Sequence, residues 1–263
     1  MANYDVIVPA GGRIDEAFSR VVGTKSKALI RLDGRTVLER TLTAFKESGR
    51  ARRIVLVGSA EVLEHADAGL ADAGLREGAS GPENIFRALD YLLESDEKPE
   101  RLLICTCDLP FIEANSILRF LAMCPEDKDF CVPLISEDDF AEAYPQAPAT
   151  FVDLRDGTYT TGCLYNVTAE GLKRAIHHID RLFLNRKSKI GLARMLGWRF
   201  VVLLLSKRLT IRDVEDKVME LLGCPGAAVP GSPAELAYDI DYLEDYHYAL
   251  QALRTMRKVP AIH

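Results

Sequence analysis

A short turn after the first apolar run of the chain carries the residues best suited to chemistry. The run Asp5–Pro9 ends in the turn Ala10–Arg13 (AGGR), and a lysine, Lys27, follows fourteen residues after Arg13. Glycines lack a Cβ atom, so backbone N–H groups in this turn can approach a phosphate chain closely. The arginine and the lysine would add the positive charge that a triphosphate requires. The turn therefore predicts that the protein handles nucleotides.

A lone aspartate, Asp108, stands directly after the apolar run Leu102–Cys107. A carboxylate at the end of a buried strand costs desolvation free energy unless a cation pairs with it. Mg²⁺ favours one or two carboxylates together with substrate phosphates, so we predict a magnesium ligand here. The alternative is that Asp108 caps a helix beginning near Glu113, but Pro110 lies between them and the spacing is too long for a cap.

A second acidic group, Asp239–Asp245, precedes the last helical pattern of the chain. Alternation places Asp239 and Asp241 on one side of an extended segment, where either could cap that helix. Glu244 and Asp245 suit the first turn of a helix. Spacing alone therefore favours a capping role over a metal-binding role for this group.

Two further segments each allow two interpretations. Gly81–Ile85 opens an amphipathic helix, and this is either an ordinary helix start or a helix N-terminus that contacts a base or a ribose. The basic segment Arg181–Lys189, which includes Lys187, precedes the apolar run Phe200–Leu205. It could clamp an acceptor phosphate or contact an anionic lipid surface, but a solvated helix end followed by a core helix is the favoured interpretation.

The composition limits the classes of protein to consider. A length of 263 residues fits one large α/β domain or two small ones, and a net charge of −6 argues against a nucleic-acid binder that uses a broad basic face. The six cysteines form no CxxC pair, which favours reduced core thiols over a metal site. No apolar run approaches the ~20 residues of a membrane span, and the first strand leaves no room for a signal peptide. We expect a cytoplasmic protein without a transmembrane segment.

The elements that must position these residues alternate between strands and helices in the first half of the chain. Near-continuous apolar strands between amphipathic helices indicate an α/β fold, with a mostly parallel central sheet flanked by helices. Ligands bind at the carboxyl ends of the strands in such sheets, where the glycine turn and Asp108 both fall. Strands are predicted at Tyr4–Val8, Ile54–Val57, Leu102–Cys107 and Phe130–Leu134, and helices at Thr36–Glu47, Glu61–Ala68, Glu83–Leu93 and Glu113–Met123.

The second half of the chain is more helical. An Asp-Gly turn signal predicts a hairpin. No repeat or linker divides the chain, so we expect a single domain over 1–263, with a helical elaboration at 169–223 and a closing segment at 239–263. The predicted elements are the hairpin Phe151–Leu154 with Tyr159–Tyr165, helices Ala169–Ile179, Gly191–Leu205 and Thr210–Leu222, a turn-rich stretch Cys224–Pro233, and a last helix Tyr242–Met256.

Taken in this order, the motifs resemble the nucleotidyltransferase superfamily of the sugar-phosphate and molybdenum cofactor guanylyltransferase-like type, the MobA-like NTP transferases. Members open with a strand, a glycine-rich turn, an arginine and a lysine in a Pro-Lys-x-Leu context, and this chain has AGGR followed by SKAL. The resemblance implies a Rossmann-like GT-A nucleotidyltransferase fold. It also implies that the nucleoside triphosphate is held by Ala10, Gly11, Gly12, Arg13 and Lys27.

The resemblance also implies a Mg²⁺ site. The mid-chain strand of the family ends in Asp-x-Pro, which Asp108–Pro110 matches with Asp108 on the ion. The C-terminal Ile-Asp-x-x-Glu-Asp of the family corresponds to Ile240–Asp245. This correspondence makes Asp241 a second expected metal ligand.

The remaining matches concern the base and the acceptor. Gly81 and Asn84 fall where the family has a base-contacting loop. Thr161 and Gly162 fall where many members have an acceptor-side glycine segment, and Lys187 is a further candidate on the acceptor side. The turn is shorter than the Gly-x-Gly-x-Arg of the family, and the stretch before Lys27 is longer.

The activity that the resemblance implies is Mg²⁺-dependent transfer of a nucleoside monophosphate from a nucleoside triphosphate to a small phosphorylated acceptor, with release of pyrophosphate. The acceptor would be a sugar phosphate, an alditol phosphate or a molybdopterin-like compound, and Lys27, Arg13 and Asp108 would be catalytic. One alternative is a nucleotide-sugar glycosyltransferase, which normally carries a mid-chain Asp-x-Asp where this chain has one acid. Another is a non-catalytic regulatory protein that binds a nucleotide without releasing pyrophosphate.

Overall fold

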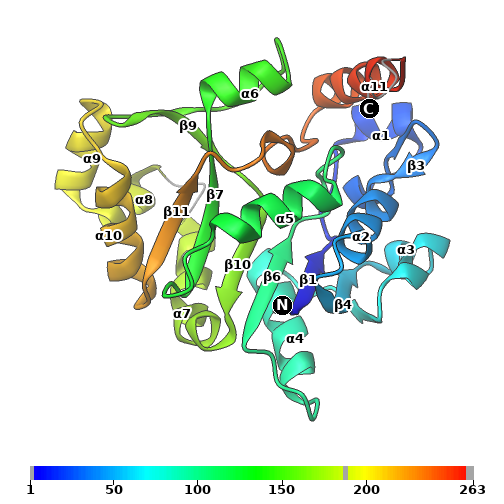
Figure 1. Cartoon of the computed structure of the whole chain (residues 1–263), viewed down its shortest axis with the longest axis horizontal. Helices are drawn as coiled ribbons and strands as arrows, with labels where there is room; N and C mark the ends of the chain where they lie inside the picture. Colours follow the sequence, from blue (N-terminus) through cyan, green and yellow to red (C-terminus); the bar gives the residue numbers. More distant parts are fainter. Residues whose placement is uncertain (1–2, 186–188, 259–263) are drawn as a thin grey trace.

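A mixed nine-stranded sheet forms the centre of the molecule, which we describe from a computed structural model of residues 3–185 and 189–258 (Figure 1). The strands of this sheet are β1 (Tyr4–Pro9), β4 (Ala51–Gly58), β5 (Ala73–Arg76), β6 (Arg101–Cys105), β7 (Phe130–Ser136), β8 (Val152–Leu154), β9 (Gly157–Thr161), β10 (Leu164–Thr168) and β11 (Gly226–Pro230). They lie in the order β5-β4-β1-β6-β10-β7-β9-β8, and β11 pairs with β7. A separate small hairpin pairs β2 (Arg31–Leu32) with β3 (Arg35–Thr36).

Helices connect most of these strands. Side-chain caps set the starts of several of them: the Thr36 and Ser80 hydroxyl groups accept hydrogen bonds from the third residues of the helices that follow. None of the described helices has both the length and the apolar character needed to cross a membrane. The helices are α1 (Glu16–Val22), α2 (Val37–Glu47), α3 (Ala60–Leu63), α4 (Gly81–Leu93), α5 (Ala114–Met123), α6 (Glu137–Ala143), α7 (Ala169–Asn185), α8 (Lys189–Leu196), α9 (Trp198–Leu205), α10 (Ile211–Leu222) and α11 (Leu243–Lys258), with 3-10 turns η1 (Lys27–Leu29), η2 (Ala66–Leu70) and η3 (Ala234–Leu236).

The sheet changes character along its width. Strands β5, β4, β1 and β6 pair in parallel, as the alternation of strands and helices predicts. Beyond β6, strand β10 is antiparallel to both β6 and β7, and the β8–β9 hairpin continues the antiparallel part. The predicted α/β class, with a largely parallel central sheet flanked by helices, is confirmed, and the second half of the chain supplies the antiparallel strands.

Helices cover both faces of the sheet because the side chains of its central strands alternate between two apolar layers. Val6 and Val8 of β1 belong to one buried cluster with α2 and α5, which includes Phe45. Ile7, between them, belongs to a second buried cluster with α4 and α7, which includes Leu89. Burial on both faces accounts for the continuous apolar character of β1.

A third buried cluster lies over the carboxyl end of the sheet and contains a group of aromatic side chains in contact with one another. The Phe111 ring stacks on Tyr144 with ring centroids 4.7 Å apart, and it meets Tyr238 edge-on at 5.0 Å. Phe140 of α6 completes the contacts with Tyr144 and Tyr238. These rings fix the segment before α11 against the segment after β6, and Figure 1 shows α11 and α6 at that end of the molecule.

Several predicted elements need correction. The stretch before Lys27 contains a helix, α1, which the Asp15 carboxylate caps by accepting from Phe18 N. The predicted helix Gly191–Leu205 is interrupted at Gly197, whose φ of +85° is a left-handed conformation that favours glycine. The predicted turn-rich stretch Cys224–Pro233 contains a strand, β11, paired in parallel with β7.

Two more predictions were too coarse. Tyr159–Tyr165 was predicted as one strand, but β9 and β10 are separate strands on either side of Gly162. Glu61–Ala68 was predicted as one helix, but the segment forms the single turn α3 followed by η2. The helix after Asp108 starts with Glu113 as its N-cap residue, so Asp108 does not cap it.

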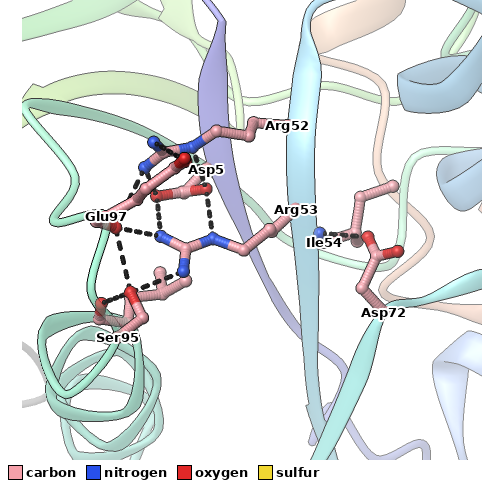
Figure 2. A network of polar contacts seen from close by, with 8 residues as sticks. Asp5, Arg52, Arg53, Ile54, Asp72, Ser95 and Glu97 are labelled. Carbon is pink, nitrogen blue, oxygen red and sulfur yellow. Dashed lines mark hydrogen bonds and ion pairs between the residues drawn. The ribbon is translucent and has the colours of Figure 1, made fainter.

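An ion-pair network ties β1 to β4 at the amino end of β1, away from the glycine turn (Figure 2). The fully buried Asp5 carboxylate accepts from Arg52 at 3.0 and 2.5 Å and from Arg53 at 2.9 and 2.6 Å. Arg52 also pairs with Glu97 at 3.1 Å, and Arg53 donates to Ser95 at 2.6 Å. Burial raises the pKa of Asp5, but the hydrogen bonds from Arg53 and Arg52 outweigh it and hold that pKa below its usual value.

Candidate active site

Three chain segments meet at the carboxyl edge of the parallel strands. The glycine turn follows β1, Asp108 follows β6, and Asp239 and Asp241 lie between η3 and α11. The Cys107 N–H donates to the Pro9 carbonyl at 3.4 Å, which joins the first two segments. The Ile240 N–H donates to the Asp108 carbonyl at 3.0 Å, which joins the third segment to the second.

The meeting point holds three carboxylates. Oxygens of Asp108, Asp239 and Asp241 lie within 4.8 Å of one another. The Thr106 hydroxyl donates to Asp108 Oδ1 at 2.6 Å and fixes that carboxylate. Burial, together with the charges of Asp108 and Asp241, raises the pKa of Asp239 to about 6, although the Lys27 charge opposes it. Such crowding of like charges favours a neighbouring cation.

Lys27 provides one positive charge at this place. Its Nζ lies 3.4 Å from Asp108 Oδ2 and also forms an ion pair with Asp241. Burial lowers the pKa of Lys27, but the charges of Asp108, Asp241 and Asp239 outweigh it, so the pKa lies above its usual value and the ammonium stays protonated. The Lys27 N–H donates to the Gly12 carbonyl at 3.0 Å, which ties the lysine to the glycine turn.

Side chains at the two glycines of the turn would displace the functional side chains around it. A Cβ atom on Gly12 would lie 3.0 Å from Lys27 Cδ, and one on Gly11 would lie 2.6 Å from Glu77 Oε2. Arg13 folds back over the turn, donating to the Gly11 carbonyl at 3.0 Å and pairing with Glu77 at 2.5 Å. Both predicted basic residues therefore lie beside the turn, and each is paired with carboxylates.

The predicted base-contacting segment lies next to the same turn. Gly81 is the first residue of α4, and Asn84 in its first turn is buried. Asn84 Oδ1 accepts from Gly78 N at 2.6 Å, and a Cβ on Gly11 would lie 3.3 Å from Asn84 Nδ2. The fold thus brings Asn84 to the turn formed by Ala10–Arg13, with Gly81 three residues earlier in the same helix, and Ala10 itself is buried in the core.

A cavity of about 470 Å³ opens beside the carboxylates. Thr161 lines it, whereas the neighbouring Gly162 supports its wall, because a Cβ there would lie 2.7 Å from the Leu236 carbonyl. The third acceptor-side candidate, Lys187, lies outside the described residues. The cavity is lined by Phe140, Pro148, Ala149, Thr150, Thr160, Thr161, Cys163, Ala237, Tyr238, Asp239, Asp241, Tyr242 and Asp245.

Two residues of the site were not assigned to it from the sequence. Asp239 was placed on the same side of an extended segment as Asp241 but was interpreted as a candidate helix cap, whereas the fold shows that its carboxylate completes the group. Glu77 follows β5 and pairs with Arg13, and no local pattern marks it. The expected capping role in the acidic group falls to Asp245, whose Oδ2 accepts from the N–H groups of Asp241 and Tyr242 at 2.9 and 2.7 Å.

Solved structures of transferases share this fold. A hypothetical transferase from Thermus thermophilus is 28% identical, with a TM-score of 0.81 over 93% of this chain and 99% of that chain. A nucleotidyl transferase from Methanothermobacter thermautotroptrophicus shares the fold at 17% identity and a TM-score of 0.57, over 96% and 99% of the two chains. A 4-diphosphocytidyl-2C-methyl-D-erythritol synthase from Anaerococcus prevotii does so at 15% identity and a TM-score of 0.56, over 96% of each. This chain therefore has the α/β fold that these nucleotidyltransferase structures share.

The sequence also shows the family. The profile of the MobA-like NTP transferase domain matches residues 6–208, which include the glycine turn, Lys27 and Asp108. The chain belongs to the MobA-like NTP transferase family and is a transferase, as the resemblance predicted. Asp239 and Asp241 lie beyond the matched residues. Comparison with curated proteins found no match.

Proposed function

We propose that this chain transfers a nucleoside monophosphate from a nucleoside triphosphate to a small phosphorylated acceptor and releases pyrophosphate. The observation that carries the proposal is the convergence of Asp108, Asp239 and Asp241 beside the Lys27 ammonium, at the edge where the glycine turn ends β1. Membership of the MobA-like NTP transferase family supports it.

The glycine turn and its two basic residues form the donor side of the proposed site. The bare backbone at Gly11 and Gly12 lets N–H groups approach the phosphates, and Lys27 and Arg13 would neutralise the charge that develops on the departing pyrophosphate. Arg13 would exchange its ion pair with Glu77 for a phosphate oxygen. Asn84, next to the turn, is placed to contact the base or the ribose.

The three carboxylates suit Mg²⁺, which prefers hard oxygen ligands. A divalent cation would relieve the crowding that raises the pKa of Asp239, and Asp108, Asp239 and Asp241 would hold it. When bound, Mg²⁺ would supply charge neutralisation at the α-phosphate and at the incoming group. The Thr106 hydrogen bond keeps the Asp108 carboxylate oriented for this role.

The proposed reaction is an in-line displacement. An oxygen of the acceptor phosphate forms a bond to the α-phosphorus, and the bond from that phosphorus to the bridging oxygen of the β-phosphate breaks as pyrophosphate leaves. A phosphate nucleophile is already ionised at neutral pH, so no strong general base is needed, and positioning and charge neutralisation supply the rate acceleration.

The cavity beside the carboxylates is the proposed acceptor site. Its lining includes Asp239, Asp241 and Asp245 but no lysine or arginine among the described residues. The attacking phosphate would therefore sit at the edge near Lys27, while the rest of the acceptor enters a cavity that repels further anions. This arrangement favours acceptors with one phosphate and an uncharged, hydroxyl-bearing body that can hydrogen-bond to Thr160 and Thr161.

The test is a pyrophosphate-release screen of the four nucleoside triphosphates with Mg²⁺ against sugar phosphates, alditol phosphates and molybdopterin. The proposal predicts pyrophosphate from at least one pair, in equal amount to a nucleotidylated acceptor. Nucleotide binding without pyrophosphate from any pair would favour the non-catalytic regulatory alternative. Sugar transfer from a nucleotide sugar would favour the glycosyltransferase alternative.

A further inference from the structure

Helix α9 carries large apolar side chains that nothing in the described structure covers. Trp198, Val202 and Leu205 are 80%, 53% and 79% exposed. Their spacing of four and three residues puts them on one face of the helix, and we call them the α9 stripe. The core helix predicted for this segment is therefore wrong for α9, which has no buried residue. Figure 1 shows α9 at the outer margin of the molecule, beside α8 and α10.

The α9 stripe lies within an unusually basic part of an acidic chain. Residues 181–212 contain nine lysines and arginines and no aspartate or glutamate, whereas the whole chain has a net charge of −6. Five of these basic residues are exposed in the described structure and form what we call the basic rim: Arg194, Arg199, Lys207, Arg208 and Arg212. Two acids from other segments face the rim, because Asp153 pairs with Lys207 at 2.6 Å and Asp213 lies within reach of the Arg199 charge.

The β8–β9 hairpin and the start of α10 hold the end of α9 in place. The Arg155 N–H donates to the Leu209 carbonyl at 2.8 Å, and Asp156 Oδ2 accepts from Ile211 N at 2.7 Å. The Lys207–Asp153 pair adds a third link. Helix α9 is therefore fixed to the same hairpin whose Thr160 and Thr161 line the cavity beside the carboxylates. These links hold the α9 stripe in its exposed position in the folded protein.

We propose that the α9 stripe and the basic rim form a docking surface for a bilayer that contains anionic lipids. Tryptophan prefers the boundary between headgroups and acyl chains, and Val202 and Leu205 would enter the apolar layer on the same side of the helix. Lysines and arginines around such an apolar face attract anionic headgroups. With only eight residues, α9 would lie in the interface and not cross it.

Charge and chemistry favour a bilayer over other occupants. Nucleic acid would pair with the basic rim but would leave the α9 stripe in water, which gives no reason for three large apolar side chains to face outward. In a two-fold dimer each stripe would meet its own copy, and the like-charged rims would then oppose one another. An anionic bilayer satisfies both the apolar and the basic part of the surface.

The test uses Trp198, which is the single tryptophan of the chain. The full chain is titrated with vesicles of phosphatidylcholine alone, or with about 30% phosphatidylglycerol, while Trp198 emission is recorded. The proposal predicts a blue shift, and quenching by brominated acyl chains, with the anionic vesicles and a much weaker response with the neutral ones. An unchanged emission maximum with anionic vesicles would overturn it.

Variants separate the two parts of the surface. Val202→Ser combined with Leu205→Ser is expected to weaken binding to anionic vesicles by about tenfold or more. Arg199→Gln combined with Arg208→Gln is expected to weaken it to a similar degree and to reduce its salt dependence. Val21→Ser is the matched control, because Val21 is 54% exposed on α1, and it should leave binding unchanged. Far-UV circular dichroism confirms that each variant is folded.

Two other outcomes would also overturn the proposal. A blue shift that grows with protein concentration without lipid, and that Val202→Ser with Leu205→Ser abolishes, would assign the surface to a second copy of the chain. Binding to a DNA duplex that is lost in Arg199→Gln with Arg208→Gln but kept in the stripe variant would assign it to nucleic acid. None of these readouts depends on nucleotidyl transfer, so the docking proposal and the proposed function can fail separately.

Discussion

At the scale of single residues, Asp108 is the position whose substitution tests the proposed metal site most directly. Its carboxylate is oriented by Thr106 and lies 3.4 Å from Lys27 Nζ. Asp108→Asn keeps the size of the side chain but removes the charge that would hold Mg²⁺, so we expect turnover to fall by about 100-fold or more with little change in stability. Asp90→Asn, on the exposed face of α4, is the matched control. Steady-state pyrophosphate release measures both, and retention of more than a few per cent of activity in Asp108→Asn would contradict the metal assignment.

In the proposed site, Lys27 and a divalent cation would compete for the same carboxylates. The ammonium already pairs with Asp108 and Asp241, so a metal that binds without nucleotide must displace it. Lys27→Met removes this competitor, and we expect it to tighten Mn²⁺ binding to the nucleotide-free protein by about tenfold. Electron paramagnetic resonance of free Mn²⁺ measures the affinity. Equal or weaker binding in Lys27→Met would show that the lysine does not block the metal site.

At the scale of elements, the Asp5 network is expected to stabilise the pairing of β1 with β4. The pKa of Asp5 is held below its usual value, so its contribution is present above about pH 4, where the carboxyl of the unfolded chain is ionised. That contribution is lost as the pH falls through the lower pKa of the folded state. We expect Asp5→Asn to lower the free energy of unfolding by about 3–5 kcal/mol at pH 7, with a smaller difference near pH 3.

Urea unfolding followed by circular dichroism at both pH values tests this expectation. Glu97→Gln is the control, because Glu97 is 77% exposed at the outer end of the network and its loss should cost less than about 1 kcal/mol. If the deficit of Asp5→Asn were the same at pH 3 and pH 7, the ion pairs would not be its cause.

The sequence predicted most elements of the parallel half but fewer of the second half. The apolar runs that form β1, β4, β6 and β7 are buried in the sheet. They could be predicted because a strand that is covered on both faces has a continuously apolar sequence. By contrast, β11 was predicted as turn because it contains glycine and proline, and its pairing with β7 is a long-range contact that no local pattern encodes. The break at Gly197 depends on a single left-handed residue inside an apolar run.

The residues of the candidate site also divide into those that the local sequence marks and those that only the fold brings together. The glycine turn and Asp108 follow apolar runs and could be found from their local context, and Lys27 was found from its spacing after Arg13 and from the family motif. The fold brings all three together. Asp239 needed three-dimensional information, because only the fold shows that its carboxylate reaches Asp108. Glu77 is separated from Arg13 by 64 residues and has no marker in its own segment.

At the scale of the whole molecule, we propose that the chain is one folding unit, as the sequence predicts. One sheet contains strands from Tyr4 to Pro230, and the aromatic cluster joins Phe111 to residues as late as Tyr248. We therefore expect a single cooperative transition in urea, with coincident midpoints for the far-UV circular dichroism signal of the helices and for the near-UV signal of the buried tyrosines. Two separated transitions would divide the chain into independent domains.

The proposed function makes its most direct prediction about which phosphorus atom is transferred. Nucleoside triphosphate labelled with ³²P at either the α or the γ position is incubated with Mg²⁺ and the acceptor found in the screen, and the products are separated by chromatography. We predict that the α label appears in the acceptor product and that the γ label leaves as pyrophosphate. Transfer of the γ label to the acceptor, or its release as inorganic phosphate with no α label transferred, would contradict nucleotidyl transfer.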